Sequence, residues 1–102
     1  MADVAWKAFE RRIAALFGTK RNGCVTGDGS EGAGSADLEN DAFSVECKLL
    51  GRPTWGQLVE ACRQAERNAT TLKEPVAIIK KKGAGQETLV VMRLETFAGW
   101  RL

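Results

Sequence analysis

The chain has no histidine, few cysteines and no long apolar run. Without histidine, no mechanism can use a histidine base and no zinc can be held by imidazole. The three cysteines have neither an even count nor CxxC spacing, so reduced thiols in a cytoplasmic protein are the simplest interpretation. No segment approaches the roughly 20 apolar residues of a membrane-spanning helix, and the N-terminus lacks a signal-peptide pattern.

The length and composition predict one small globular domain. The chain has 102 residues, of which 44 % are hydrophobic, so we expect a single domain over residues 1–102. A chain this short buries only about two-thirds of its unfolded surface, so dimerisation would add stability. The net charge of +2 is too small to indicate a partner.

The hydrophobic pattern predicts an α/β fold of order α-β-β-β-α-β-β. Thr54 and Gln57 have the spacing of a capping box, Gly18 is a suitable helix stop, and Thr96 could cap a last helical turn. Residues 27–35 are rich in glycine and predict a loop. The expected helices and strands cover residues 4–18, 24–26, 36–40, 42–50, 54–69, 75–79 and 88–94.

The segment 42–50 carries the strongest chemical signal. Apolar and polar residues alternate there, as in a half-buried strand. Glu46 and Lys48 therefore share one face, roughly 7 Å apart. A hairpin over residues 36–50 would return Asp37 to the same place. A carboxylate and a lysine on one rigid strand, with Asp37 brought beside them, predict a site that holds a metal ion beside a phosphate. The alternative for Glu46 and Lys48 is an ion pair on an exposed sheet face.

Asp41 and Glu10 are two further acidic candidates for this site. Asp41 is closer to Glu46 in sequence, but the Asn40-Asp41-Ala42 segment has the composition of the hairpin turn, so Asp37 is preferred. Glu10 lies at the edge of the apolar stripe of the first helix, from which it could reach a cleft beside the core. Its alternative is a solvated helix glutamate.

The glycine-rich segment could also be a phosphate-binding loop or a calcium-binding loop, but its sequence favours neither. It lacks the Gly-Lys-Ser/Thr of a phosphate-binding P-loop. The segment 28–39 has the length of an EF-hand loop, but Ala33 stands where the sharp turn requires glycine, and no helices flank it. A calcium site is therefore not expected.

The combined pattern resembles the PD-(D/E)xK nuclease superfamily, and within it the archaeal-type Holliday junction resolvases and their small phage relatives. The resemblance covers nearly the whole chain, and Ala36 replaces the proline of the superfamily name. The matching segments are Phe9 to Gly18 with Lys20 and Arg21, Ser35-Ala36-Asp37, Val45-Glu46-Cys47-Lys48 and Gln64-Ala65.

The resemblance implies a restriction-endonuclease-like core, with a mixed central sheet flanked by helices, and Mg²⁺-dependent hydrolysis of DNA phosphodiesters in which Mn²⁺ substitutes. Asp37, Glu46 and the Cys47 backbone carbonyl would bind the metal, and Glu10 would be an additional metal or water ligand. Lys48 would orient the attacking water or stabilise charge in the transition state. Gln64 would belong to the catalytic set, although a solvated helix residue explains it equally well.

The resemblance also implies a substrate and a partner. The suggested substrate is branched DNA such as a four-way junction, on which the glycine-rich loop would close. The suggested partner is a second copy of the chain, and exposed apolar residues such as Trp55, Phe97 and Trp100 would suit such a homodimer. The suggested origin is a phage or a bacterium. The alternatives are a nicking, restriction-like or repair endonuclease on duplex DNA and a non-catalytic DNA-binding protein. The cations expected to contact phosphate, which could also be ordinary surface charge, are Lys20, Arg21, Arg52, Arg63, Arg67, Lys80, Lys81 and Lys82.

Overall fold

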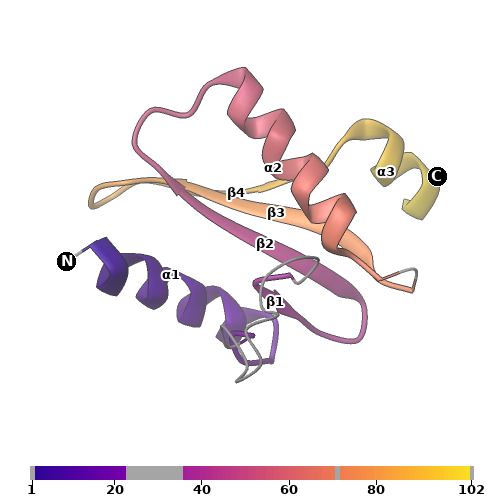
Figure 1. Ribbon diagram of the computed structural model, residues 1–102, viewed down its shortest axis with the longest axis horizontal. Helices are drawn as coiled ribbons and strands as arrows, with labels where there is room; N and C mark the ends of the chain where they lie inside the picture. The colour runs from indigo at the N-terminus through magenta and orange to yellow at the C-terminus, as the bar shows by residue number, and fades with distance from the viewer. Residues whose placement is uncertain (1, 23–35, 71, 102) are drawn as a thin grey trace, which may run out of the picture.

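The computed structural model describes residues 2–22, 36–70 and 72–101 and shows an α/β fold (Figure 1). The strand expected at residues 24–26, Cys24 and the glycine-rich loop lie outside the described residues. The elements are α1 (Ala2–Leu16), β1 (Leu38–Glu39), β2 (Phe43–Leu50), α2 (Trp55–Asn68), β3 (Glu74–Lys81), β4 (Thr88–Val91) and α3 (Leu94–Arg101).

The described strands form one mixed sheet in the order β1-β2-β3-β4. β1 and β2 make the expected antiparallel hairpin, and β3 and β4 make a second one. β2 and β3 are parallel along their whole length, from Phe43 opposite Glu74 to Leu50 opposite Lys81. The parallel pair needs a crossover connection, and α2 supplies it. None of the described helices is long and apolar enough to cross a membrane.

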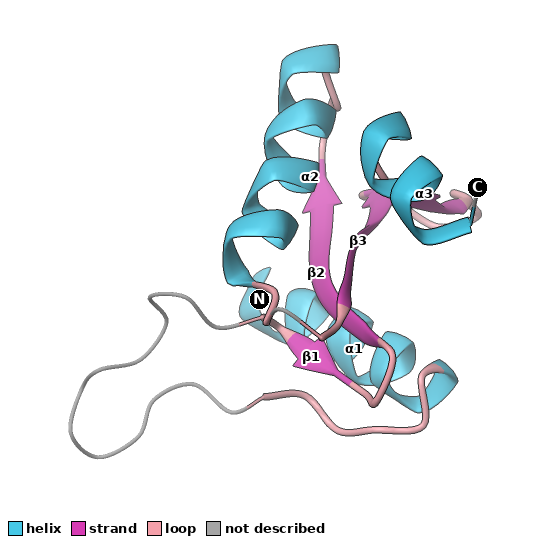
Figure 2. Ribbon diagram, turned by 90° about the vertical axis from the view of Figure 1, so that its right-hand side faces the viewer, coloured by secondary structure: helices cyan, strands magenta, loops and turns pink. Residues whose placement is uncertain are grey.

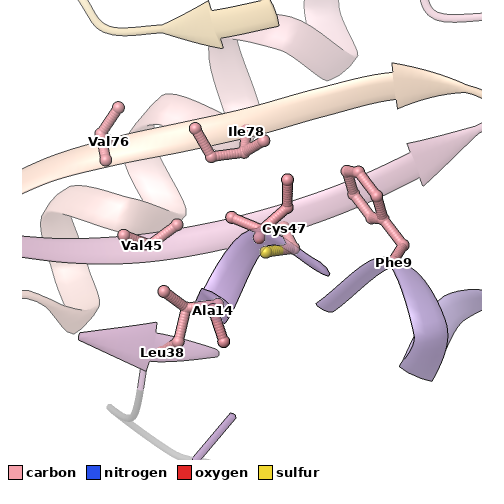
Figure 3. Close-up of a cluster of buried hydrophobic side chains, with 8 residues drawn as sticks. Phe9, Ala14, Leu38, Val45, Cys47, Val76 and Ile78 are labelled. Carbon is pink, nitrogen blue, oxygen red and sulfur yellow. The ribbon is translucent and has the colours of Figure 1, made fainter. Parts of the chain in front are cut away.

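Helices cover both faces of β2, with α1 on one side of the sheet and α2 on the other (Figures 1 and 2). Phe9 and Ile13 of α1 pack on Val45 and Cys47 of β2, in the cluster of Figure 3. A smaller cluster places Ala61 of α2 against β3. The prediction that β2 is half-buried is therefore wrong for its polar face, because α2 crosses it and leaves Ser44 and Glu46 only 1 % exposed.

Two predictions about helix ends are confirmed. Thr54 caps α2 with a complete capping box, in which the Gln57 backbone N–H donates to the Thr54 hydroxyl and the Thr54 N–H donates to the Gln57 side chain. Gly18 follows α1 with a φ of 70°, a left-handed conformation that favours glycine. These signals are local in sequence, which is why they could be predicted.

The C-terminal segment differs from its prediction. β4 ends at Val91 and α3 already begins at Leu94, so Thr96 lies inside a helix and does not cap one. Its hydroxyl instead donates to Glu66 Oε2 of α2 at 3.1 Å. Trp100, expected to be exposed, is half-buried with its ring edge-to-face on Phe43 at 5.3 Å. Packing of α3 on the rest of the domain accounts for both differences.

Candidate active site

The candidate site lies where the pairing of β1 with β2 ends. β1 pairs with Ser44 and Val45 only, and the Asp37 N–H donates to the Val45 carbonyl at 3.0 Å. The next N–H of the ladder, that of Cys47, donates to Asp37 Oδ2 at 2.7 Å. A side-chain carboxylate thus takes the place of a backbone acceptor. This bond fixes the Asp37 carboxyl beside β2.

The structure brings Asp37, and not Asp41, to Glu46. The two carboxyl groups are linked by a hydrogen bond, which lowers the pKa of Asp37 and raises that of Glu46. Asp41 is exposed in the hairpin turn, as the sequence predicted. Two carboxyl groups that share a hydrogen bond repel each other when both are ionised. A proton or a cation between them removes this repulsion.

Glu46 titrates near neutral pH. Burial under α2 is the main cause that raises its pKa, and the negative charge of Asp37 adds to it, giving a pKa of about 7. The Asn68 amide donates to Glu46 Oε2 at 2.8 Å and lowers the pKa, as does the charge of Lys48. Burial also raises the pKa of Asp37 above its usual value. The pair therefore holds a proton below about pH 7 and loses it above that pH.

The backbone of Cys47 faces this pair, while its side chain does not. In a strand the N–H and C=O of one residue point to the same side, so the Cys47 carbonyl shares the β1 side with the N–H that binds Asp37. The thiol is buried in the cluster against α1 (Figure 3). Burial and the nearby carboxylates raise the pKa of this thiol, so it stays protonated. Cys47 thus offers the site an oxygen and not a thiolate.

Glu10 is buried and belongs to the same cluster. Its side chain is 2 % exposed, so the solvated-glutamate alternative is wrong. The Arg21 Nε donates to Glu10 Oε1 at 2.8 Å, whereas the buried Glu10 Oε2 has no hydrogen-bond partner among the described residues. Burial raises the pKa of Glu10 and the charge of Asp37 raises it further, against the lowering effects of Arg21 and Lys48. The orphaned oxygen marks a place for a further ligand.

Lys48 is a second cation near the carboxyl groups, besides Arg21. It is half-buried on the α2 face of β2, one pleat beyond Glu46. Its charge lowers the pKa of Glu10, Asp37 and Glu46 alike. Among the ion pairs of the described residues, none joins Glu46 to Lys48. The simple cross-face ion pair on an exposed sheet is therefore not what the fold contains.

The α2 face above Glu46 includes one residue that the sequence did not reveal. Asn68, in the last turn of α2, binds Glu46 directly. Gln64 lies one helical turn earlier on the same side and is half-buried. α2 runs back along β2 (Figure 1), so Gln64 lies nearer than Asn68 to the start of α2. Only the spacing of four from Gln64 could have drawn attention to Asn68.

The cations expected to contact DNA are spread over several elements. Arg21 is drawn into the site by Glu10, and its guanidinium lies 6.0 Å from the centre of the Trp6 ring. Arg67 pairs with Glu60 on the exposed side of α2. The Lys80 ammonium donates to backbone carbonyls of the turn after β3. The exposed cations among the rest are Lys20, Arg52, Arg63, Lys81 and Lys82.

The donor set suits a hard divalent cation. No three histidine, cysteine, aspartate or glutamate side chains of the described chain are grouped tightly enough to form a metal cluster on their own. Mg²⁺, however, needs only one or two carboxylates and keeps several waters. The Asp37 and Glu46 pair and the Cys47 carbonyl supply such oxygens, and Glu10 lies near enough for the charge of Asp37 to raise its pKa.

Comparisons with known proteins add no relative to this description. The chain matches no protein-family model, no curated protein and no solved structure.

Proposed function

We propose that this chain is a metal-dependent endonuclease of the PD-(D/E)xK type, with a restriction-endonuclease-like fold. The observation that carries the proposal is the meeting of Asp37 and Glu46 at the point where β1 leaves β2, with Lys48 next on the same face. Buried carboxyls that share a proton are costly to a fold. A cation that replaces the proton and serves catalysis explains why they are there.

Each side chain has a role in phosphodiester hydrolysis. Bound Mg²⁺ or Mn²⁺ would lower the pKa of a water and polarise the phosphoryl oxygen. Asp37 and Glu46 would hold the cation, and Asn68 orients Glu46. Lys48 stabilises the charge that develops on the phosphate. Glu10 orients a water with Oε2, which no described residue binds, while Arg21 holds the other oxygen in place.

The proposed substrate is branched DNA, such as a four-way junction, cut by a homodimer. Two-fold symmetry suits a junction because two strands must be cut at equivalent positions. Sequence-independent affinity would come from the scattered cations, through contacts to phosphates.

The test is cleavage of a labelled four-way junction and of a linear duplex of matching sequence, in Mg²⁺, in Mn²⁺ and in chelator. Glu46→Gln keeps the size of the side chain and should abolish cutting. Glu87→Gln, at an exposed position outside the site, is the matched control and should cut like the wild type. Lys48→Ala should reduce the rate by at least a hundredfold, as is typical when a group that stabilises transition-state charge is lost.

The outcomes separate the alternatives. Metal-dependent cutting of the junction alone, lost in Glu46→Gln, supports a resolvase. Equal cutting of junction and duplex keeps the nuclease and rejects the junction preference. Tight DNA binding with no cutting of either substrate would point to a non-catalytic DNA-binding protein.

A further inference from the structure

A groove of about 620 Å³ lies apart from the carboxyl cluster, between the N-terminal half of α1 and the end of the β3–β4 hairpin. Figure 1 shows the start of α1 beside the turn that joins these two strands. Phe9 and Leu49 contribute apolar surface to it, and Trp6, which is 40 % exposed, forms part of its wall. The groove thus presents an aromatic face that a flat ligand can reach.

The rim of the groove is positively charged. Arg12, Lys80 and Lys82 line it, and the described side chains of its lining include no aspartate or glutamate. The Arg12 guanidinium donates to the Thr88 hydroxyl at 3.1 Å and so joins α1 to β4. The Lys80 ammonium holds the turn through the carbonyls of Lys81 and Gly83. An apolar interior with a cationic rim complements a ligand that has both a flat ring and a phosphate.

The groove is connected to the carboxyl cluster through Trp6. The Arg21 guanidinium that binds Glu10 also lies over the Trp6 ring, at 6.0 Å from its centre. Trp6 and Glu10 are one helical turn apart, a rise of about 6 Å along α1. Trp6 of the groove and Glu10 of the carboxyl cluster are thus joined through one guanidinium, which places the two sites next to each other along α1.

We propose that this groove holds one unpaired nucleotide of the strand that the active site cuts, with its base against Trp6 and its phosphate beside Lys82 and Arg12. The proposal rests on the nuclease function proposed above and specifies its substrate further. A base in a duplex is stacked and paired, so it cannot enter. The groove would therefore favour DNA whose bases are unpaired next to the cleaved phosphate, as at a branch point or a single-stranded end.

The test measures binding without cleavage, by fluorescence anisotropy of a labelled single-stranded oligothymidylate and of a duplex of equal length, in chelator. Trp6→Leu keeps an apolar side chain but removes the aromatic face, and should weaken single-strand binding about tenfold. Lys82→Gln should weaken it about threefold and reduce its salt dependence by about one phosphate contact. Duplex binding should change less than twofold in Trp6→Leu.

A matched control lies outside the groove. Lys7→Gln removes a cation of α1 that does not line the groove. This variant should bind the single strand within twofold of the wild type. Circular dichroism melting checks that Trp6→Leu is folded. If it is not, Lys82→Gln, on an exposed turn, decides the question.

Failure of the groove and failure of the nuclease give different results. If the wild type cuts DNA but Trp6→Leu and Lys82→Gln bind the single strand normally, the groove proposal is overturned and the nuclease stands. An equal loss of single-strand and duplex binding would also overturn it, since the groove would then contact backbone only. If the groove variants lose single-strand binding but the wild type cuts no DNA, the groove is supported as a nucleotide site and the nuclease is rejected.

Discussion

Asn68 acts on the charge of Glu46 through one hydrogen bond from the last turn of α2. A donor to a carboxylate stabilises the ionised form, and the ionised form is the one that binds a cation. Asn68 is thus a positioning residue, whose effect should appear in a pH profile.

Replacing Asn68 with alanine should move the binding of Mn²⁺ to higher pH. A hydrogen bond to a charged group contributes about 1.5 kcal/mol or more, so the pH midpoint should rise by about one unit. The measurement is isothermal calorimetry of Mn²⁺ binding from pH 6 to pH 9. A purely structural role would reduce affinity equally at all pH values and leave the midpoint unchanged.

The sequence predicts which residues form the candidate site, but it does not predict the side chains that hydrogen-bond to them. The alternation of β2 places Glu46 and Lys48 on one face, and the hairpin pattern brings Asp37 to them. Neither pattern reveals that Asn68 binds Glu46 or that Arg21 binds Glu10, because those bonds depend on how α2 and the segment after α1 pack on the sheet. Arg21 was expected to contact phosphate, and the structure gives it a carboxylate partner.

At the scale of the element, the hairpin of β1 and β2 depends on the Asp37 side chain as well as on backbone pairing. β1 is only two residues long, and the bond from the Cys47 N–H to Asp37 extends it by one more contact. One carboxylate therefore serves both the fold and the proposed chemistry.

Two substitutions of Asp37 separate these roles. Asp37→Asn retains an oxygen acceptor for the Cys47 N–H, so the free energy of unfolding should change little. Asp37→Ala leaves a buried N–H unpaired and should lower that free energy by about 1–3 kcal/mol. Urea denaturation in chelator measures both, and both variants should lose Mn²⁺ binding. Equal stability of the two would show that the bond contributes nothing to the hairpin.

Local sequence patterns predict most of the helices and strands, but they do not predict which faces of these elements are buried. The Thr54 capping box, the Gly18 stop and the order of helices and strands after residue 36 could be predicted, with the exception of α3. The burial of Ser44 and Glu46 could not, because it is α2 that covers that face of β2. The early start of α3 likewise depends on its contacts with α2, where Arg93 and Thr96 bind Glu66.

At the scale of the whole molecule, several large apolar side chains are exposed, as the proposed homodimer requires. Trp55 is 80 % exposed and Phe97 is 40 % exposed, whereas Trp100 is partly covered by Phe43. Val90 on the β4 strand is 70 % exposed. Sedimentation at micromolar concentration should show a dimer. A monomer under these conditions would contradict the homodimer, and the symmetric cutting of a junction would lose its basis.

The three buried carboxyls should make stability depend on pH in an unusual direction. Burial is the main cause that raises the pKa of Glu10, Asp37 and Glu46, with Glu46 reaching about 7 from 4.5. Between these two values the folded chain binds more protons than the unfolded chain, so its stability falls as pH rises. For Glu46 alone the change is on the order of 3 kcal/mol.

In chelator, the melting temperature should therefore be higher at pH 5 than at pH 8. Mg²⁺ or Mn²⁺ should raise it at pH 8, where a cation can replace the lost proton, and should have little effect at pH 5, where protons compete for the same oxygens. Glu46→Gln should remove most of the pH dependence and also the response to metal, because an amide needs neither proton nor cation. Calorimetric melting of the wild type and this variant at both pH values, with and without metal, measures all four effects. A wild type that is more stable at pH 8 in chelator would mean that the carboxyls are already ionised and stabilised by the protein alone, which would remove the main physical reason for placing a cation between them.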